Sequence, residues 1–140
     1  MSINTAVGSC LCGTVVFEFA LPTVFAGHCH CTMCQRAHGA GFVTWIGVRE
    51  DGFRITKGAG EVEHFKSSPH TTRSFCRRCG SSMFCNNDTH ENLIDITLAN
   101  VHGKIDREIK AHFYNDCRAP WTDVNDDLKK LRGESGTEAL

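Results

Sequence analysis

The chain has 140 residues, of which 41% are apolar and 22% are charged, and this balance suits one compact domain with a buried core. Its 15 basic and 16 acidic side chains give a formal net charge of −1, which excludes a generally cationic nucleic-acid binder. The sequence contains no apolar run of about 18 residues and no basic segment followed by an apolar one at its start. We therefore expect no membrane association and a reducing, cytoplasmic compartment.

Short apolar segments that alternate or are rich in β-branched residues recur along the chain, separated by Gly, Asn or Asp, and predict a mainly antiparallel β domain. The predicted strands are residues 14–20, 42–48, 53–57, 62–66, 73–76, 82–85, 93–98 and 109–114. The second and third of these are expected to pair as a hairpin across the turn at Asp51-Gly52. Short helices are predicted over residues 32–38 and 123–131. We expect one domain over residues 1–132 and a flexible tail over residues 133–140.

The nine cysteines are more than packing requires, and an odd number without an export signal argues against a disulfide framework. Metal binding is the remaining common reason for so many thiols. Two chelating pairs, Cys10-x-Cys12 and Cys76-x-x-Cys79, are each followed by a glycine that allows the backbone to turn. Together the two pairs predict a set of four thiolates, the usual closed shell of a structural zinc ion.

A third cysteine group, Cys29-x-Cys31-x-x-Cys34, places three thiols within six residues. Three protein ligands leave one position of a zinc ion open, which is typical of catalytic rather than structural sites. A thiol that enters this position would be deprotonated by the metal. Three histidines lie nearby in sequence, and each could be a fourth ligand, an acid–base group or a surface residue: His28, His30 and His38.

Two cysteines remain outside these groups. Cys85 alternates with Phe84 in a predicted strand and is expected to be a small buried residue. Cys117 precedes an Arg-Ala-Pro-Trp segment and is expected to be structural. The alternative is a thiol-based reductase in which one of these two cysteines is the nucleophile.

Three blocks of the sequence resemble, in content and order, the motifs of the glutathione-dependent formaldehyde-activating enzyme family, also called the CENP-V/GFA domain family. The blocks are Gly8-Ser9-Cys10-x-Cys12-Gly13, Cys29-His30-Cys31-x-x-Cys34-Gln35-Arg36 and Ser74-Phe75-Cys76-x-x-Cys79-Gly80. The resemblance implies a zinc-binding β-tent of antiparallel sheets with one or two short helices. It also implies two zinc ions per chain, a structural one and a catalytic one. The ligands would be Cys10, Cys12, Cys76 and Cys79 for the first ion, and Cys29, Cys31 and Cys34 for the second.

The resemblance further implies a carbon–sulfur lyase or synthase that acts on a small thiol–aldehyde adduct such as S-(hydroxymethyl)glutathione. The expected partners are then a small thiol, such as glutathione, and an aldehyde such as formaldehyde, with neither nucleic acid nor a membrane as a partner. Four arginines are candidates to bind a carboxylate of the thiol: Arg36, Arg73, Arg77 and Arg78. The alternative function is a zinc-stabilised binding module without turnover, which a histidine or a fourth cysteine closing the second site would favour.

Overall fold

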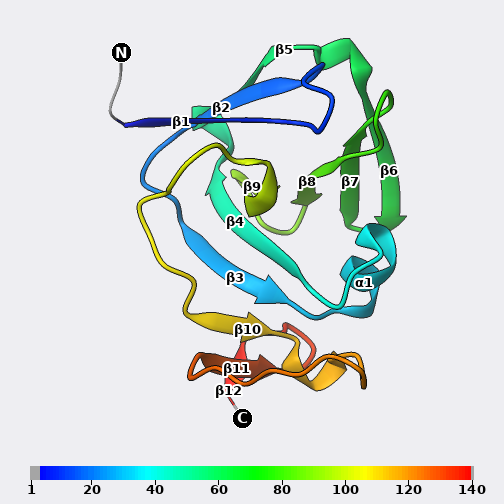
Figure 1. The fold of residues 1–140 in the computed structure, drawn as a ribbon, viewed down its shortest axis with the longest axis vertical. Helices are drawn as coiled ribbons and strands as arrows, with labels where there is room; N and C mark the ends of the chain where they lie inside the picture. Colours follow the sequence, from blue (N-terminus) through cyan, green and yellow to red (C-terminus); the bar gives the residue numbers. More distant parts are fainter. Residues whose placement is uncertain (1–3, 140) are drawn as a thin grey trace. The chain divides into compact units, whose positions relative to one another are not determined.

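The computed structural model describes residues 4–139, which form a mainly β protein with one α-helix and several short 3₁₀ turns (Figure 1). The predicted fold class, mainly β with antiparallel sheets and a short helix, is confirmed. These residues divide into two compact units, each built from two separate stretches of chain. Within the described residues, 4–25 and 46–107 make the first unit, and 26–45 and 108–139 make the second.

The first unit begins with an antiparallel three-stranded sheet in the order β1-β2-β5. Its strands are β1 (Thr5–Ser9), β2 (Val16–Ala20) and β5 (Phe53–Lys57). Alternation along β2 turns Phe17 and Phe19 into the core, where both are completely buried. The ring of Phe84 meets that of Phe17 edge-on, with 5.0 Å between the ring centroids, so aromatic rings pack together within a core that is otherwise mainly aliphatic.

Four further strands of the first unit are hydrogen-bonded in the order β9-β8-β7-β6, each antiparallel to its neighbour. They are β6 (Val62–Ser68), β7 (Thr71–Cys76), β8 (Ser82–Asn87) and β9 (Leu93–Thr97). Three 3₁₀ turns lie in this unit: Glu50–Gly52, Ala59–Glu61 and Leu98–Asn100. Strand β4 (Val43–Arg49) gives its last four residues to the first unit and its first three to the second.

The second unit holds the strand order β12-β11-β10-β3-β4. Its elements are β3 (Phe25–Cys29), α1 (Thr32–His38), β10 (Ala111–Phe113), the 3₁₀ turn Asn115–Cys117, β11 (Lys129–Arg132) and β12 (Glu138–Ala139). Strand β10 is parallel to both β3 and β11, whereas β11 and β12 are antiparallel. Figure 1 shows β10, β11 and β12 side by side near the C-terminal end of the chain.

The predicted hairpin of residues 42–48 and 53–57 is wrong in its pairing. The strand over residues 53–57 exists with the predicted bounds, but it pairs with β2. Residues 50–52 form a 3₁₀ turn instead of a two-residue hairpin turn. In this pairing, Phe53 of β5 lies opposite Phe19 of β2, and Ile55 of β5 lies opposite Phe17 of β2. This register of apolar pairs decides the pairing.

The predicted helix over residues 123–131 is also wrong, because Lys129–Arg132 form strand β11. The Asp126 carboxylate accepts a hydrogen bond from the Leu128 N–H at 3.1 Å, which closes a local turn. Such side-chain bonds to the backbone compete with helix formation. The chain beyond this turn pairs with β10, at Ala111 opposite Lys129.

Strand β12 lies within the segment expected as a flexible tail, and it pairs with β11 at Leu131–Ala139 and Arg132–Glu138. A single domain over residues 1–132 and a flexible tail stay predictions. Residues 1–3 of that domain and residue 140 of that tail lie outside the described residues. Within residues 4–139, no helix has the length and apolar character needed to cross a membrane.

Candidate metal centres

The first cysteine group lies in the first unit and contains the four thiols predicted for a closed site: Cys10, Cys12, Cys76 and Cys79. Their Sγ atoms lie within 4.8 Å of one another. All nine cysteines of the chain fall within the described residues, and they carry thiols rather than disulfides. The fold therefore gathers four sulfur atoms without a covalent link, as a metal shell requires.

Each pair of this four-thiol group sits in a tight turn that a glycine closes. The Gly13 N–H donates to the Cys10 carbonyl at 3.2 Å, and the Gly80 N–H donates to the Cys76 carbonyl at 2.7 Å. Both glycines have a positive φ, 78° and 79°, which a residue with a Cβ adopts only with strain. The Val15 N–H points at the Cys10 sulfur at 3.3 Å. The turns thus bring two cysteines of each pair to one side and supply N–H groups to sulfur.

Ser81 tunes the protonation of this group. Its hydroxyl oxygen lies 3.3 Å from the Cys79 Sγ and accepts the Leu11 N–H at 2.8 Å. Hydrogen bonding from Ser81 lowers the pKa of Cys79 to about 5, because it favours the thiolate. Burial raises the pKa of Cys76 to about 11. Ionisation of the buried Cys76 beside the Cys79 thiolate is unfavourable, and a divalent metal ion would offset this cost, so the donor set fits such an ion.

The second cysteine group lies in the second unit at the turn from β3 into α1. Cys29 ends β3, Cys31 is the N-cap of α1 and Cys34 lies in the first turn of the helix. Their three Sγ atoms lie within 4.8 Å of one another. The Cys34 N–H donates to the Cys31 Sγ at 3.3 Å, so one sulfur both caps the helix and belongs to the group. Helix geometry therefore fixes the spacing of these thiols.

The charge state of this three-thiol group also fits a cation. Hydrogen bonding to Cys31 and Cys34, together with burial, raises the pKa of Cys29 far above its ordinary range. A second and third thiolate in this position are unfavourable because like charges repel and water is excluded. A bound divalent cation removes this penalty. Both cysteine groups could accordingly hold metal ions.

No fourth donor closes the three-thiol group among the residues that the structure describes. No histidine, cysteine or acidic side chain in residues 4–139 brings a ligand atom within 4.8 Å of all three sulfurs. The three candidate histidines have other neighbours. His28 Nδ1 is 2.8 Å from Thr44 Oγ1, His30 Nε2 is 2.8 Å from His112 Nδ1, and the His38 ring meets Trp45 edge-on.

Two residues that sequence reasoning did not place in the site support this group. The Gln35 side-chain amide donates to the His30 carbonyl at 2.7 Å and to the Cys117 carbonyl at 3.0 Å. Tyr114 has a φ of 53°, a left-handed value that is uncommon for a residue with a Cβ. Burial raises the pKa of Tyr114, and the charges of the three thiols raise it further. Only the Gln in the Cys34-Gln35 motif gave a sequence signal; Tyr114 has none.

The candidate arginines differ in their surroundings. Arg77 and Arg78 both pair with Glu61 in the first unit, at 2.5 and 3.3 Å, and they lower the pKa of that carboxyl group. The Arg73 Nε donates to Ser67 at 3.2 Å. Arg36 lies in the last turn of α1, two residues after Cys34. Of the four, Arg36 is the one placed on the helix that carries the three-thiol group.

The two cysteines outside these groups, Cys85 and Cys117, differ in their exposure to solvent. Cys85 in β8 is 9% exposed, in agreement with a packing role, and Cys117 is exposed in the 3₁₀ turn that follows β10. Neither belongs to a cysteine group.

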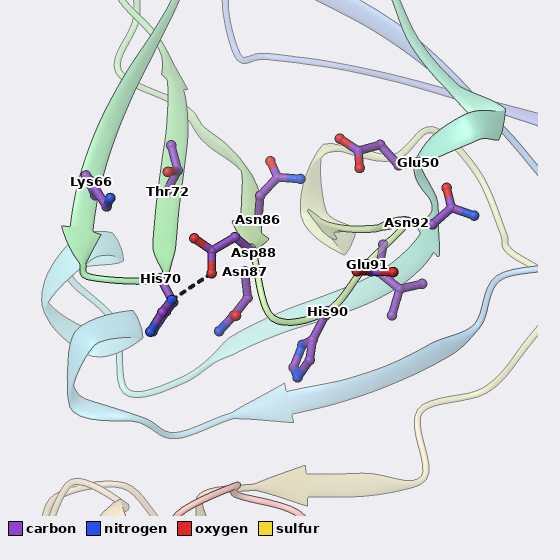
Figure 2. Close-up of a pocket in the computed structure, with 11 residues that line it drawn as sticks. Glu50, Lys66, His70, Thr72, Asn86, Asn87, Asp88, His90, Glu91 and Asn92 are labelled. Carbon is purple, nitrogen blue, oxygen red and sulfur yellow. Dashed lines mark hydrogen bonds and ion pairs between the residues drawn. The ribbon is translucent and has the colours of Figure 1, made fainter.

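A polar pocket of about 360 Å³ lies in the first unit (Figure 2). Its walls are mainly asparagine, acidic and histidine side chains, among them Asn86, Asn92, Glu91 and His90. Figure 2 shows His70 reaching Asp88, with 2.7 Å between His70 Nδ1 and Asp88 Oδ1 of these exposed side chains. The pocket contains none of the residues predicted for the site.

Comparisons with known proteins show the family and the fold of this chain. Residues 5–119 match the profile of a family described as glutathione-dependent formaldehyde-activating enzyme. A crystal structure of a Rhodobacter sphaeroides protein, a structural genomics target, has a similar fold. That protein shares 23% sequence identity over 74% of this chain and 96% of its own, with a TM-score of 0.62. The search of curated proteins gave no match.

Proposed function

The chain belongs to the glutathione-dependent formaldehyde-activating enzyme family, and on this premise we propose that it is a zinc-dependent carbon–sulfur lyase. Its substrate class is a small thiol–aldehyde adduct such as S-(hydroxymethyl)glutathione, which the same site forms from glutathione and formaldehyde in the reverse direction. Two zinc ions per chain would be held, one by each cysteine group.

The single observation that carries this proposal is the three-thiol group with no fourth protein donor in residues 4–139. The four-thiol group has a full tetrahedral set, which suits a structural ion. The three-thiol group leaves a position for an exogenous ligand. Because three thiolates outweigh the charge of Zn²⁺, the site would favour delivery of a thiolate over activation of water.

Zinc in this site would lower the pKa of a thiol that enters the open position. In the synthase direction the thiolate sulfur would attack the aldehyde carbon, a C–S bond would form as the C=O π bond breaks, and the oxygen would take up the proton that the thiol lost. The lyase direction reverses each change: the hydroxyl proton leaves, the C=O bond re-forms, and the C–S bond breaks. No oxidant or reductant is needed.

The chain's own residues shape this site. Cys31 and Cys34 are held by the start of α1, and Gln35 ties the helix to the strand that carries Cys29 through the His30 carbonyl. Arg36, in the last turn of α1 and two residues after Cys34, would bind a carboxylate of an anionic thiol. These roles belong to the proposal.

The test is the rate at which zinc-loaded protein forms and cleaves S-(hydroxymethyl)glutathione, followed by exchange NMR above the spontaneous rate. We expect Cys31→Ser to reduce this rate to the uncatalysed level, while Cys117→Ser, which alters an exposed thiol of the same unit, leaves it unchanged. A folded Cys31→Ser variant with full turnover contradicts the proposal. Wild-type protein with two zinc ions and no turnover would indicate a binding module instead.

A further inference from the structure

The strand that carries Cys29 has two chemically different faces. Backbone pairing with β10 continues past the end of β3, because the His30 N–H donates to the Phe113 carbonyl at 2.9 Å. Side chains of an extended segment alternate, so Cys29 and Cys31 share one face and His28 and His30 share the other. Ring contacts agree with this alternation: His28 and His30 both lie against His112, with centroid distances of 4.9 and 5.0 Å.

A hydrogen-bond chain runs along this imidazole face from the surface to a buried side chain. The carboxylate of Asp126, whose side chain is 43% exposed, lies 2.9 Å from His112 Nε2. His112 Nδ1 lies 2.8 Å from His30 Nε2, and both histidines are almost completely buried. The remaining nitrogen, His30 Nδ1, is buried and has no hydrogen-bond partner.

The carboxylate at the end of this hydrogen-bond chain determines which nitrogen of each ring carries a proton. A carboxylate only accepts hydrogen bonds, so His112 Nε2 is the donor to Asp126. In a neutral His112, Nδ1 is then an acceptor, and the proton between the two rings belongs to His30 Nε2. His30 Nδ1 is accordingly left as a bare acceptor. One exposed acid thus sets the tautomers of two buried imidazoles.

We propose that Asp126 and His112 are positioning residues for the three-thiol site, which act through the side chain of His30. This inference rests on the proposed function only in taking Cys29 and Cys31 as metal ligands. His30 is the residue between these two ligands, and its backbone and ring are held at three points: by Phe113, Gln35 and His112. The hydrogen-bond chain fixes the His30 ring from the face opposite the sulfurs. It thereby fixes the path of the backbone that sets the distance between Cys29 and Cys31.

The decisive variant is Asp126→Asn. Asp126 Oδ1 accepts hydrogen bonds from the Leu128 N–H at 3.1 Å and the Lys130 ammonium at 3.2 Å. An Asn side chain keeps its oxygen toward these donors, which turns its NH₂ toward His112 Nε2. The NH₂ takes the place of Oδ2, which is the oxygen nearer His112 Nε2, at 2.9 Å against 3.1 Å for Oδ1. We therefore expect this nitrogen to accept from the NH₂, so that each ring along the hydrogen-bond chain changes tautomer and His30 Nδ1 gains the proton. The neighbouring exposed acid provides the matched control, Asp127→Asn.

The experiment uses the full chain loaded with zinc or with NMR-active cadmium, above pH 8. We expect His30 and His112 of the wild type to be protonated at Nε2 by nitrogen NMR, and His30 of Asp126→Asn at Nδ1. The cadmium resonance of the three-thiol site should move in Asp126→Asn, and its zinc affinity should fall ~10-fold or more, while the four-thiol resonance stays in place. Asp126→Glu, which keeps a carboxylate, should restore the wild-type tautomers, and Asp127→Asn should behave as the wild type.

Two outcomes overturn the inference. The first is a wild-type His30 protonated at Nδ1, which requires no variant. The second is a folded Asp126→Asn protein with the wild-type cadmium resonance and zinc affinity at the three-thiol site. Absence of adduct turnover with these NMR results as expected would count against the proposed function and leave the positioning role intact.

Discussion

The four-thiol group and the three-thiol group use the same ligand chemistry but are built by the chain in opposite ways. The four-thiol group joins turns far apart in sequence, since Cys12 and Cys76 are 64 positions apart. The three-thiol group lies within the six residues from Cys29 to Cys34, at one strand-to-helix turn. Closing a loop of some 64 residues costs the unfolded chain about 2 kcal/mol more in entropy than closing one of six residues. The distant group is therefore suited to stability, and the local group, whose helix already arranges its donors, is suited to chemistry.

The largest expected effect is on the four-thiol group. Cys79→Ser removes one of four donors, and structural zinc contributes on the order of 10 kcal/mol to small domains. We expect this variant to lose its cooperative thermal transition, as measured by circular dichroism. Cys85→Ser, at a buried cysteine outside the groups, should cost about 1 kcal/mol and keep that transition. Equal melting temperatures for the two variants would contradict a stabilising role for the four-thiol group.

Cys31→Ser should separate the two groups. The variant is expected to lose about one zinc ion of two by metal analysis. Its free energy of unfolding, measured with denaturant, should fall by less than about 3 kcal/mol, because only a local loop is released. If this variant instead unfolds like Cys79→Ser, the contrast between a stabilising and a chemical group is wrong.

The pH dependence of the second unit should report on His30. Burial lowers the pKa of His30 to about 4, against 6.5 for the ordinary side chain. The unfolded chain therefore binds a proton between these values that the folded chain does not, so stability is lost as the pH falls from 6.5 to 4, by up to about 3 kcal/mol. Denaturant unfolding across this range should show a shallower fall for His30→Gln than for the wild type. Parallel curves would show that His30 does not titrate in this way.

The smallest effect concerns the shell around the four-thiol group. Ser81→Ala removes the hydroxyl that lowers the pKa of Cys79, so metal binding must compete with a proton at higher pH. We expect a ~10-fold loss of zinc affinity at this group in a chelator competition. The three-thiol group of the same protein is the internal control. A uniform loss at both groups would contradict the separation of the two sites.

Local patterns were sufficient to predict the cysteine groups and much of the β structure. The turns at Cys10-x-Cys12 and Cys76-x-x-Cys79 bring together the two sulfurs of each pair. The preference of a structural zinc ion for four donors predicted that the two pairs would meet. The helix over residues 32–38 has the predicted bounds because Cys31 caps its start and Gly39, with a φ of 61°, ends it. In these places short-range geometry leaves few alternatives.

Long-range pairing could not be predicted from the same sequence. The partner of residues 53–57 is set by contacts with Phe17 and Phe19, which no local signal reveals. In residues 123–131, capping residues and spaced leucines favoured a helix, but the bonds of Asp126 to Leu128 and His112 gave a turn. The imidazole face was missed for a similar reason, since His30 and His112 are 82 residues apart.

The separation between the two halves of the four-thiol group also affects how the protein is made. A ribosome adds about 5–20 residues per second, so Cys10 and Cys12 are synthesised roughly 3–13 s before Cys76 exists. During that interval the nascent chain carries only two of the four thiol ligands, and these two sulfurs can be oxidised or can bind a different metal ion. A metal ion that binds all four sulfurs must therefore reach a polypeptide in which Cys79 has already been synthesised.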